Sequence, residues 1–350
     1  MQRAANRFLT LEIARFIAAF CVATDHLAGM ATANGAGRMP FGFSLPPIAA
    51  VLFFFVLSGF VIQNAHGRDL GQPAALGRYL WRRVWRIYPL YWISLLFPLW
   101  FLWHSSSLAY LAQIISLTPT ASFYMPEANP PAWTLRFELA FYIVFALTLL
   151  PRLGRWVLGV WLALLLVCWF PQLFHVVVGQ YFHALPAGLA WYFFGIHNLL
   201  FLCGVEAATL LARRPLPGWG LWALLGGAAG TVLVLLPRQR WGFDYPNPTL
   251  EFFTGIAFAG LILALTGLEQ SGRLTPPGWT AILGTMSYPF YLIHADCGGL
   301  LIRGLKQSGL AHLLPVPELF VLEMALSLAA AALLAFLIDK PLQRLARRVV

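Results

Sequence analysis

Apolar segments long enough to cross a membrane follow one another along the chain, separated by short polar loops. A hydrocarbon core of about 30 Å needs about 20 apolar residues of helix to span it. The sequence therefore predicts an all-α, polytopic membrane bundle of about ten transmembrane helices, forming a single domain over residues 1–350 with no separate soluble domain. The predicted spans are Leu9 to Met30, Pro47 to Ala65, Ile87 to Trp103, Pro130 to Leu150, Trp156 to Phe174, Leu185 to Leu211, Gly218 to Leu236, Leu250 to Leu268, Trp279 to Leu301 and Leu319 to Ile338.

The composition excludes an ordinary soluble protein. Only 10% of the residues are charged while 60% are hydrophobic, and such a chain lacks the polar surface that water requires. The net charge of +10 raises the question of nucleic acid, but the basic residues lie in short loops between apolar segments, where membrane topology explains them. We expect membrane lipid as the surroundings and no nucleic-acid partner.

The distribution of positive charge orients the bundle. With ten spans, both termini fall on one side, and that side then carries most of the 23 lysines and arginines. Because cytoplasmic loops are enriched in these residues, we expect both termini in the cytoplasm. The inner residues include Arg68, Arg78, Arg82, Arg83, Arg86, Arg152, Arg155, Arg213, Arg273, Lys340, Arg344, Arg347 and Arg348, whereas Arg38, Arg238, Arg240, Arg303 and Lys306 fall outside.

Two local features have structural expectations of their own. The segment Leu108 to Leu117 is too short to span, so we expect it at the outer interface or re-entering between helices. Asn129 precedes two prolines and is expected to cap the helix that follows.

The four cysteines lie in apolar stretches without metal-ligand spacing, so neither a disulfide nor a metal site is predicted.

Ionisable side chains at membrane depth are costly unless paired or hydrated, and they are therefore candidate functional residues. Arg15 and His26 are separated by about three helical turns, so they share one face with a rise of about 16 Å between them. The predicted topology brings His26, His294 and Glu138 to a similar depth in the outer half. A second group lies toward the cytoplasm, namely Arg15, Ser58, Tyr88, Tyr91 and the loop Arg82 to Arg86.

The order of these residues resembles the bacterial membrane-bound acyltransferase-3 family, which acylates polysaccharides and other glycans, and the resemblance covers nearly the whole chain. The matching segments are Leu11 to His26, Phe53 to Ile62 (FFFVLSGFVI), Arg82 to Trp92 (RRVWRIYPLYW), Pro131 to Tyr142 (PAWTLRFELAFY) and Gly284 to His294 (GTMSYPFYLIH). Ile338 to Pro341 (IDKP) departs from the family pattern, because Asp339 stands where relatives often have Glu.

The resemblance implies a transferase of the bacterial inner membrane that uses acyl-CoA, expected to be acetyl-CoA, as co-substrate and a surface or lipid-linked glycan as acceptor. His26 is the expected general base. Asp25 or Glu138 would orient it or offset its charge, or Glu138 would instead hold the acceptor. His294 would be a second catalytic group or a hydrogen-bond donor to the carbonyl oxygen. A covalent acyl-His or acyl-Ser intermediate stays open.

The donor is expected at the cytoplasmic group of residues. Arg15, Arg82, Arg83 and Arg86 would hold the phosphates, because a guanidinium binds phosphate oxygens bidentately. Ser58 and Tyr88 complete this predicted donor site.

Alternative interpretations remain at this point. Buried His, Glu and Arg side chains also form proton relays in transporters and flippases, and the chain could be a structural subunit of a glycan-synthesis complex. The Arg82 to Arg86 loop could serve only to orient the protein. Trp133 and Tyr142, expected near the outer mouth, could stack on a sugar ring or belong to an interfacial aromatic belt.

Overall fold

The computed structural model describes residues 7–37, 47–102, 106–118, 129–170, 189–213, 216–235, 247–310 and 313–349, and in these ranges every named element is helical. The α-helices are α1 (Leu9–Asn34), α2 (Pro47–His66), α3 (Leu76–Leu102), α4 (Leu108–Ser116), α5 (Ala132–Leu147), α6 (Gly154–Trp169), α8 (Leu189–Phe194), α9 (His197–Arg213), α10 (Gly218–Leu235), α11 (Pro248–Gln270), α12 (Ala281–Gln307), α13 (Val316–Leu333) and α14 (Lys340–Val349). A π-helical segment, Leu334–Asp339, joins α13 to α14, and 3₁₀ turns at Pro73–Ala75 and Gly278–Thr280 precede α3 and α12.

The prediction of a helical membrane protein is confirmed. Helix occupies part or all of each predicted span within the described ranges. Six helical segments there are long and apolar enough to cross a membrane, namely Leu9–Asn34, Pro47–His66, Ala190–Arg213, Gly218–Leu235, Pro248–Gln270 and Val316–Arg348. The count of ten spans and the cytoplasmic placement of the termini stay predictions.

The prediction for Asn129 is wrong. Helix α5 begins at Ala132 with Pro131 at its N-cap and no side-chain cap. The Asn129 amide instead donates to Ser94 Oγ at 3.0 Å and to the Leu292 carbonyl at 3.1 Å. A buried amide satisfies its donors wherever carbonyl or hydroxyl oxygens are nearest, and here they belong to α3 and α12. Asn129 thus links three segments that are distant in sequence.

Helix α4 has nine residues, as its short apolar segment led us to expect, and its end is held by α3. The hydroxyls of Tyr88 and Tyr91 donate to the carbonyls of Ser116 and Ile114 at 2.9 and 2.7 Å. The Trp92 indole donates to the Ile115 carbonyl at 3.0 Å. These donors satisfy the carbonyls that a helix end leaves without partners.

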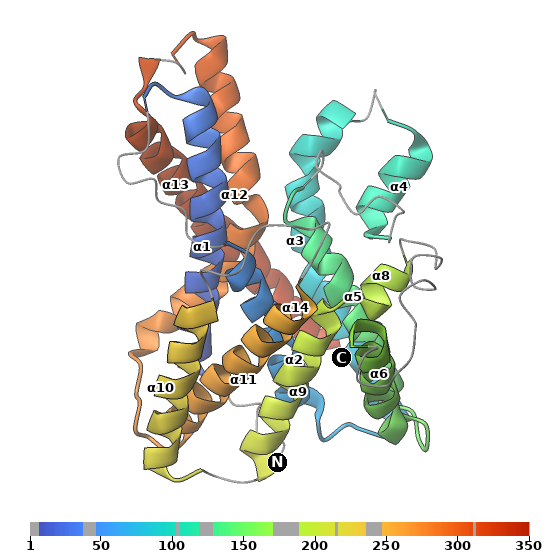
Figure 1. The fold of residues 1–350 in the computed structure, drawn as a ribbon. Helices are drawn as coiled ribbons and strands as arrows, with labels where there is room; N and C mark the ends of the chain where they lie inside the picture. Colours follow the sequence, from blue (N-terminus) through green and yellow to red (C-terminus); the bar gives the residue numbers. More distant parts are fainter. Residues whose placement is uncertain are drawn as a thin grey trace.

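Helix packing divides the molecule into neighbouring groups (Figure 1). Helices α1, α12 and α13 pack together, and α2 lies at the centre against α1, α9 and α11. Helix α10 flanks α11, while α3 contacts α5, α12 and α14. The interior therefore borders α1, α2, α3, α5 and α12, the helices that carry the candidate residues.

Reciprocal glycines bring the backbones of α2 and α9 into contact. A Cβ atom at Gly204 would lie 1.8 Å from the Val56 carbonyl oxygen, and one at Gly59 would lie 1.9 Å from the Phe201 carbonyl oxygen. Glycine allows this approach, as small residues commonly do between membrane helices. Gly59 is thus a packing residue, and it sets the position of its neighbour Ser58.

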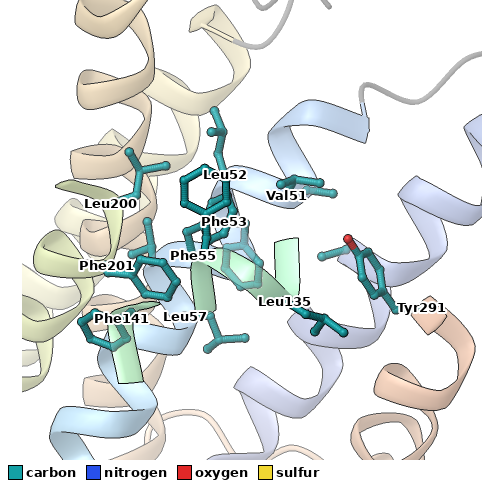
Figure 2. Close-up of a cluster of buried hydrophobic side chains, with 14 of the residues drawn as sticks. Val51, Leu52, Phe53, Phe55, Leu57, Leu135, Phe141, Leu200, Phe201 and Tyr291 are labelled. Atoms are coloured by element: carbon teal, nitrogen blue, oxygen red, sulfur yellow. The ribbon is translucent and has the colours of Figure 1, made fainter. Parts of the chain in front are cut away.

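Aromatic side chains fill the space around this contact (Figure 2). Phe201 of α9 stacks on Phe141 of α5 with ring centroids 4.3 Å apart, and it lies 5.2 Å from the ring of Phe55 on α2. Offset or tilted aromatic pairs of this kind contribute roughly 0.5–1.5 kcal/mol beyond their buried area. The cluster fixes α2, α5 and α9 relative to one another.

Candidate active site

Two histidines from distant parts of the chain form a direct pair. His26 Nδ1 lies 2.9 Å from His294 Nε2, and the two rings stack at 5.1 Å with an interplanar angle of 24°. His294 is fully buried, whereas His26 is half-buried. The packing of α1 on α12 makes the pair possible, and Gly298 assists because a Cβ there would come within 2.8 Å of the Leu27 side chain.

The Phe290 carbonyl determines how this pair is hydrogen-bonded. His294 Nδ1 lies 3.2 Å from that carbonyl oxygen, which can only accept a hydrogen bond. For two neutral imidazoles, His294 therefore carries its proton on Nδ1 and accepts at Nε2 from the Nδ1–H of His26. This leaves Nε2 of His26 with a free lone pair, the form of imidazole that can remove a proton.

A cavity of about 120 Å³ opens between α1, α2, α3, α5 and α12. Its wall combines cations with one carboxylate, hydroxyl groups and aromatic rings. The polar lining residues are Arg15, Ser58, Arg83, Arg86, Thr134, Glu138, Tyr142, Ser287, Tyr288 and Tyr291. Such a mixture suits a ligand that has anionic groups together with an uncharged, flexible portion.

Each of the three cavity arginines is linked to a carboxylate, either directly or, for Arg83, through a histidine. Arg15 lies 3.5 Å from Glu12, and Arg86 lies 3.8 Å from Asp339. Arg83 donates to His66 Nε2 at 3.1 Å, and Nδ1 of the same histidine donates to Asp69 at 2.9 Å. These partners restrict the orientation of each guanidinium. The cavity therefore contains three cations whose positions are fixed by contacts with other residues.

Glu138 belongs to the cavity. It accepts a short hydrogen bond from the Tyr142 hydroxyl and a longer one, at 3.4 Å, from Ser58 Oγ. The Tyr142 ring in turn lies 5.4 Å from the Arg83 guanidinium. Glu138 is thus the carboxylate among the cavity arginines, and it can balance their charge or hold a polar group of a ligand.

The histidine pair and the cavity are connected through Tyr291. Its side chain lines the cavity, its hydroxyl lies 3.1 Å from Thr134 Oγ1, and its ring centroid lies 6.3 Å from that of His294. Along α1, the rise from Arg15 to His26 is about 16 Å. An extended ligand that begins among the arginines would have to cover that distance to reach the histidines.

The structure brings most of the predicted site residues together, in two groups. His26 and His294 form the pair, and Asp25 interacts electrostatically with the His26 ring. The predicted residues that line the cavity are Arg15, Ser58, Arg83, Arg86 and Glu138. Two others lie apart from both groups: Arg82 is exposed, and the Tyr88 hydroxyl bonds the end of α4.

The predicted outer aromatic residues also separate. Trp133 packs against Phe55 and His197, with ring centroids 6.2 and 5.8 Å away. Tyr142 lies beside Arg83 and Glu138, away from the outer group in which the sequence placed it.

Sequence reasoning missed the residues that orient Arg83 and Arg86. His66 and Asp69 follow the second apolar segment directly, and their spacing of three residues at a helix end was an available signal. Asp339 stood out only as a departure from a motif. Tyr288 and Tyr291 lie within the family-like segment Gly284 to His294, but the sequence alone did not indicate what they contact.

Known proteins resemble this chain in sequence. Exopolysaccharide production protein ExoZ of Rhizobium meliloti (strain 1021) is 27% identical over 317 residues, which cover 85% of this chain and 90% of ExoZ. Acyltransferase MdmB of Streptomyces mycarofaciens is 26% identical over 273 residues, which cover 70% of this chain and 66% of MdmB. No solved structure matches the chain.

The family comparison spans both groups of site residues. The acyltransferase domain of the acyltransferase-3 family matches residues 8–340, a range that includes the histidine pair, the cavity and Asp339. The chain therefore belongs to the acyltransferase-3 family.

Proposed function

We propose that this protein transfers an acyl group, acetyl in the first instance, from cytoplasmic acyl-CoA to a hydroxyl of a surface or lipid-linked glycan at the bacterial inner membrane. The observation that carries the proposal is the arrangement of three oriented arginines in one cavity, with a histidine pair about 16 Å further along α1. The similarity to ExoZ, an exopolysaccharide production protein, supports a glycan acceptor.

The donor occupies the cavity in this proposal. Arg15, Arg83 and Arg86 bind the phosphates of coenzyme A through forked hydrogen bonds. The pantetheine arm then runs past Tyr291 toward α1 and α12, and the thioester reaches His26. The separation of the two groups matches a donor whose charge and reactive carbonyl lie at opposite ends.

His26 Nε2 acts as the general base. It removes the proton of the acceptor hydroxyl while the oxygen attacks the thioester carbonyl carbon. The carbon–sulfur bond breaks, and the leaving thiolate takes the proton back from the His26 imidazolium. The products are an O-acylated glycan and coenzyme A as a thiol, with no net change in protons.

His294 supports His26 through the hydrogen bond that fixes its tautomer, and Asp25 offsets the charge that the ring gains. Glu138 and Ser58 act in the cavity, where they contact the donor or balance the arginines.

The test uses purified protein in lipid vesicles with acetyl-CoA and a glycan extract from the producing cells. We expect release of free coenzyme A thiol that depends on the acceptor, together with glycan that gains the mass of an acetyl group. Release of coenzyme A thiol without acylated glycan would contradict the proposal. Movement of the glycan across the vesicle membrane without thiol release would also contradict it. The second result would favour a flippase.

A further inference from the structure

The π-helical segment and the helix α14 that follows it contact α3 at three points. Trp81 Nε1 donates to the Ala346 carbonyl at 3.1 Å, and Gln343 Nε2 donates to the Trp85 carbonyl at 2.8 Å. The third contact is the ion pair between Arg86 Nη1 and Asp339 Oδ2 at 3.8 Å. The α3 residues of all three contacts lie in or directly before the Arg82 to Arg86 segment. The π-helical segment and α14 therefore support the part of α3 that lines the cavity.

The Asp339 carboxylate is buried and held on both oxygens. Its side chain is 7% exposed, Oδ2 faces Arg86, and Oδ1 accepts from Gln343 Nε2 at 3.3 Å. Asp339 is the last residue of the π-helical segment. Pro341, two residues further along, has no backbone N–H to donate. A π-helical turn shifts the direction of the next side chains relative to a regular α-helix, and here Asp339 faces α3.

Arg86 is held from a second side by an aromatic ring. Its guanidinium lies 5.0 Å from the centroid of Tyr288, whose hydroxyl donates to the Ile87 carbonyl at 3.0 Å. The side chain is 33% exposed and lines the cavity. Because a guanidinium has five N–H donors, Asp339 can engage one edge while others stay available to a ligand.

We propose that Asp339 is a positioning residue of the donor site, which holds Arg86 so that its remaining N–H groups meet a donor phosphate. The inference rests on the proposed function, in which Arg86 binds coenzyme A. The negative charge of Asp339 also reduces the repulsion between Arg86 and the other two cavity arginines, so that three cations can line one small space.

The experiment measures the apparent Michaelis constants for acetyl-CoA and for the glycan in reconstituted vesicles. Asp339→Asn should raise the donor constant about fivefold, which corresponds to about 1 kcal/mol of donor binding, and leave the acceptor constant unchanged. Asp339→Glu should restore most of the donor affinity, because the carboxylate returns. Glu318→Gln, at an exposed acid in the first turn of α13, is the matched control and should change neither constant.

A double substitution tests whether Asp339 acts through Arg86. Arg86→Lys should itself raise the donor constant, and adding Asp339→Asn should then have little further effect. Independent, additive effects would overturn the inference, as would a loss of turnover number or folding stability with an unchanged donor constant. If Asp339→Asn fails to accumulate, Gln343→Ala removes its second hydrogen bond, and its donor constant decides in the same way.

The outcomes separate the two proposals. If Arg86→Lys raises the donor constant and Asp339→Asn does not, the inference fails while the donor site stands. If Arg86→Lys leaves the donor constant unchanged, the proposed donor site itself fails.

Discussion

His26 donates through Nδ1 to Nε2 of His294, and the direction of this hydrogen bond follows from the second contact of His294, to the carbonyl oxygen of Phe290. A backbone carbonyl cannot donate, so a neutral His294 can accept only at the nitrogen that faces His26. The two contacts together assign the free lone pair to Nε2 of His26. This assignment separates the roles of the two histidines and leads to different expectations for their variants.

His26→Ala should abolish acyl transfer, because the variant has no base at that position. Insertion and abundance should stay near normal, because the ring that is removed is only half-buried. Loss of a general base lowers the turnover number by roughly 10²- to 10⁴-fold. The measurement is acceptor-dependent thiol release from acetyl-CoA, with protein abundance checked by immunoblot. Wild-type turnover in this variant would disprove the assignment of His26 as the base.

His294→Phe should lower the turnover number without changing the donor Michaelis constant. Phenylalanine fills a similar volume but cannot accept the hydrogen bond from His26, so the correct tautomer of the base is no longer selected. Losing such an orienting partner should lower turnover by about a hundredfold, at the lower end of the range expected for losing the base itself. A change confined to the donor constant would instead place His294 in donor binding.

Replacing Arg83 and Arg86 together by Lys should weaken donor binding while preserving topology. Both residues line the cavity, and Lys keeps the charge that orients the protein but loses the forked geometry. We expect the donor constant to rise about tenfold or more, as for lost hydrogen bonds to charged groups, with the acceptor constant nearly unchanged. Unchanged constants for both substrates would leave the segment with a purely topological role.

Gly204→Ala should destabilise the protein, because its new Cβ would lie 1.8 Å from the Val56 carbonyl oxygen of the facing helix. The backbones of α2 and α9 would have to separate, at a cost of roughly 1–3 kcal/mol. Thermal unfolding in detergent measures the effect. Gly230→Ala on α10 is the control, since nothing lies within 4 Å of a Cβ at that position. Equal melting temperatures for the two variants would refute the close-packing argument.

The topology prediction is independent of catalysis. Arg78 and Arg213 are replaced one at a time by cysteine in a cysteine-free background. Each new cysteine should react with an impermeant thiol reagent only after the membrane is permeabilised, because it faces the cytoplasm. Cysteines at Arg38 and Arg238, which lie outside the described residues, should react in intact spheroplasts. Labelling of the cysteine at position 213 in intact spheroplasts would overturn the ten-span count, because one misplaced helix inverts every later loop.

The sequence alone determined the class of the protein and the identity of most candidate residues. Apolar segment lengths and the scarcity of charge predict a helical membrane protein, because a bilayer requires each spanning segment to satisfy its own backbone hydrogen bonds. The periodicity of a single helix also placed Arg15 and His26 on one face. The cost of ionisable groups in an apolar environment singled out His26, His294 and Glu138 without any structure. Arg86 was singled out by the basic segment Arg82 to Arg86.

The tertiary structure alone decided which of these residues meet. Periodicity fixes the faces of one helix but not its rotation against its neighbours, and that rotation depends on packing such as the contact of Gly59 and Gly204 with the facing backbones. For this reason Glu138, expected at the depth of His26, lies instead with the arginines, and Asn129 links three segments where it was expected to cap one. The pairing of Asp339 with Arg86 joins the C-terminal end of the matched region to α3, and no local pattern in the sequence encodes it.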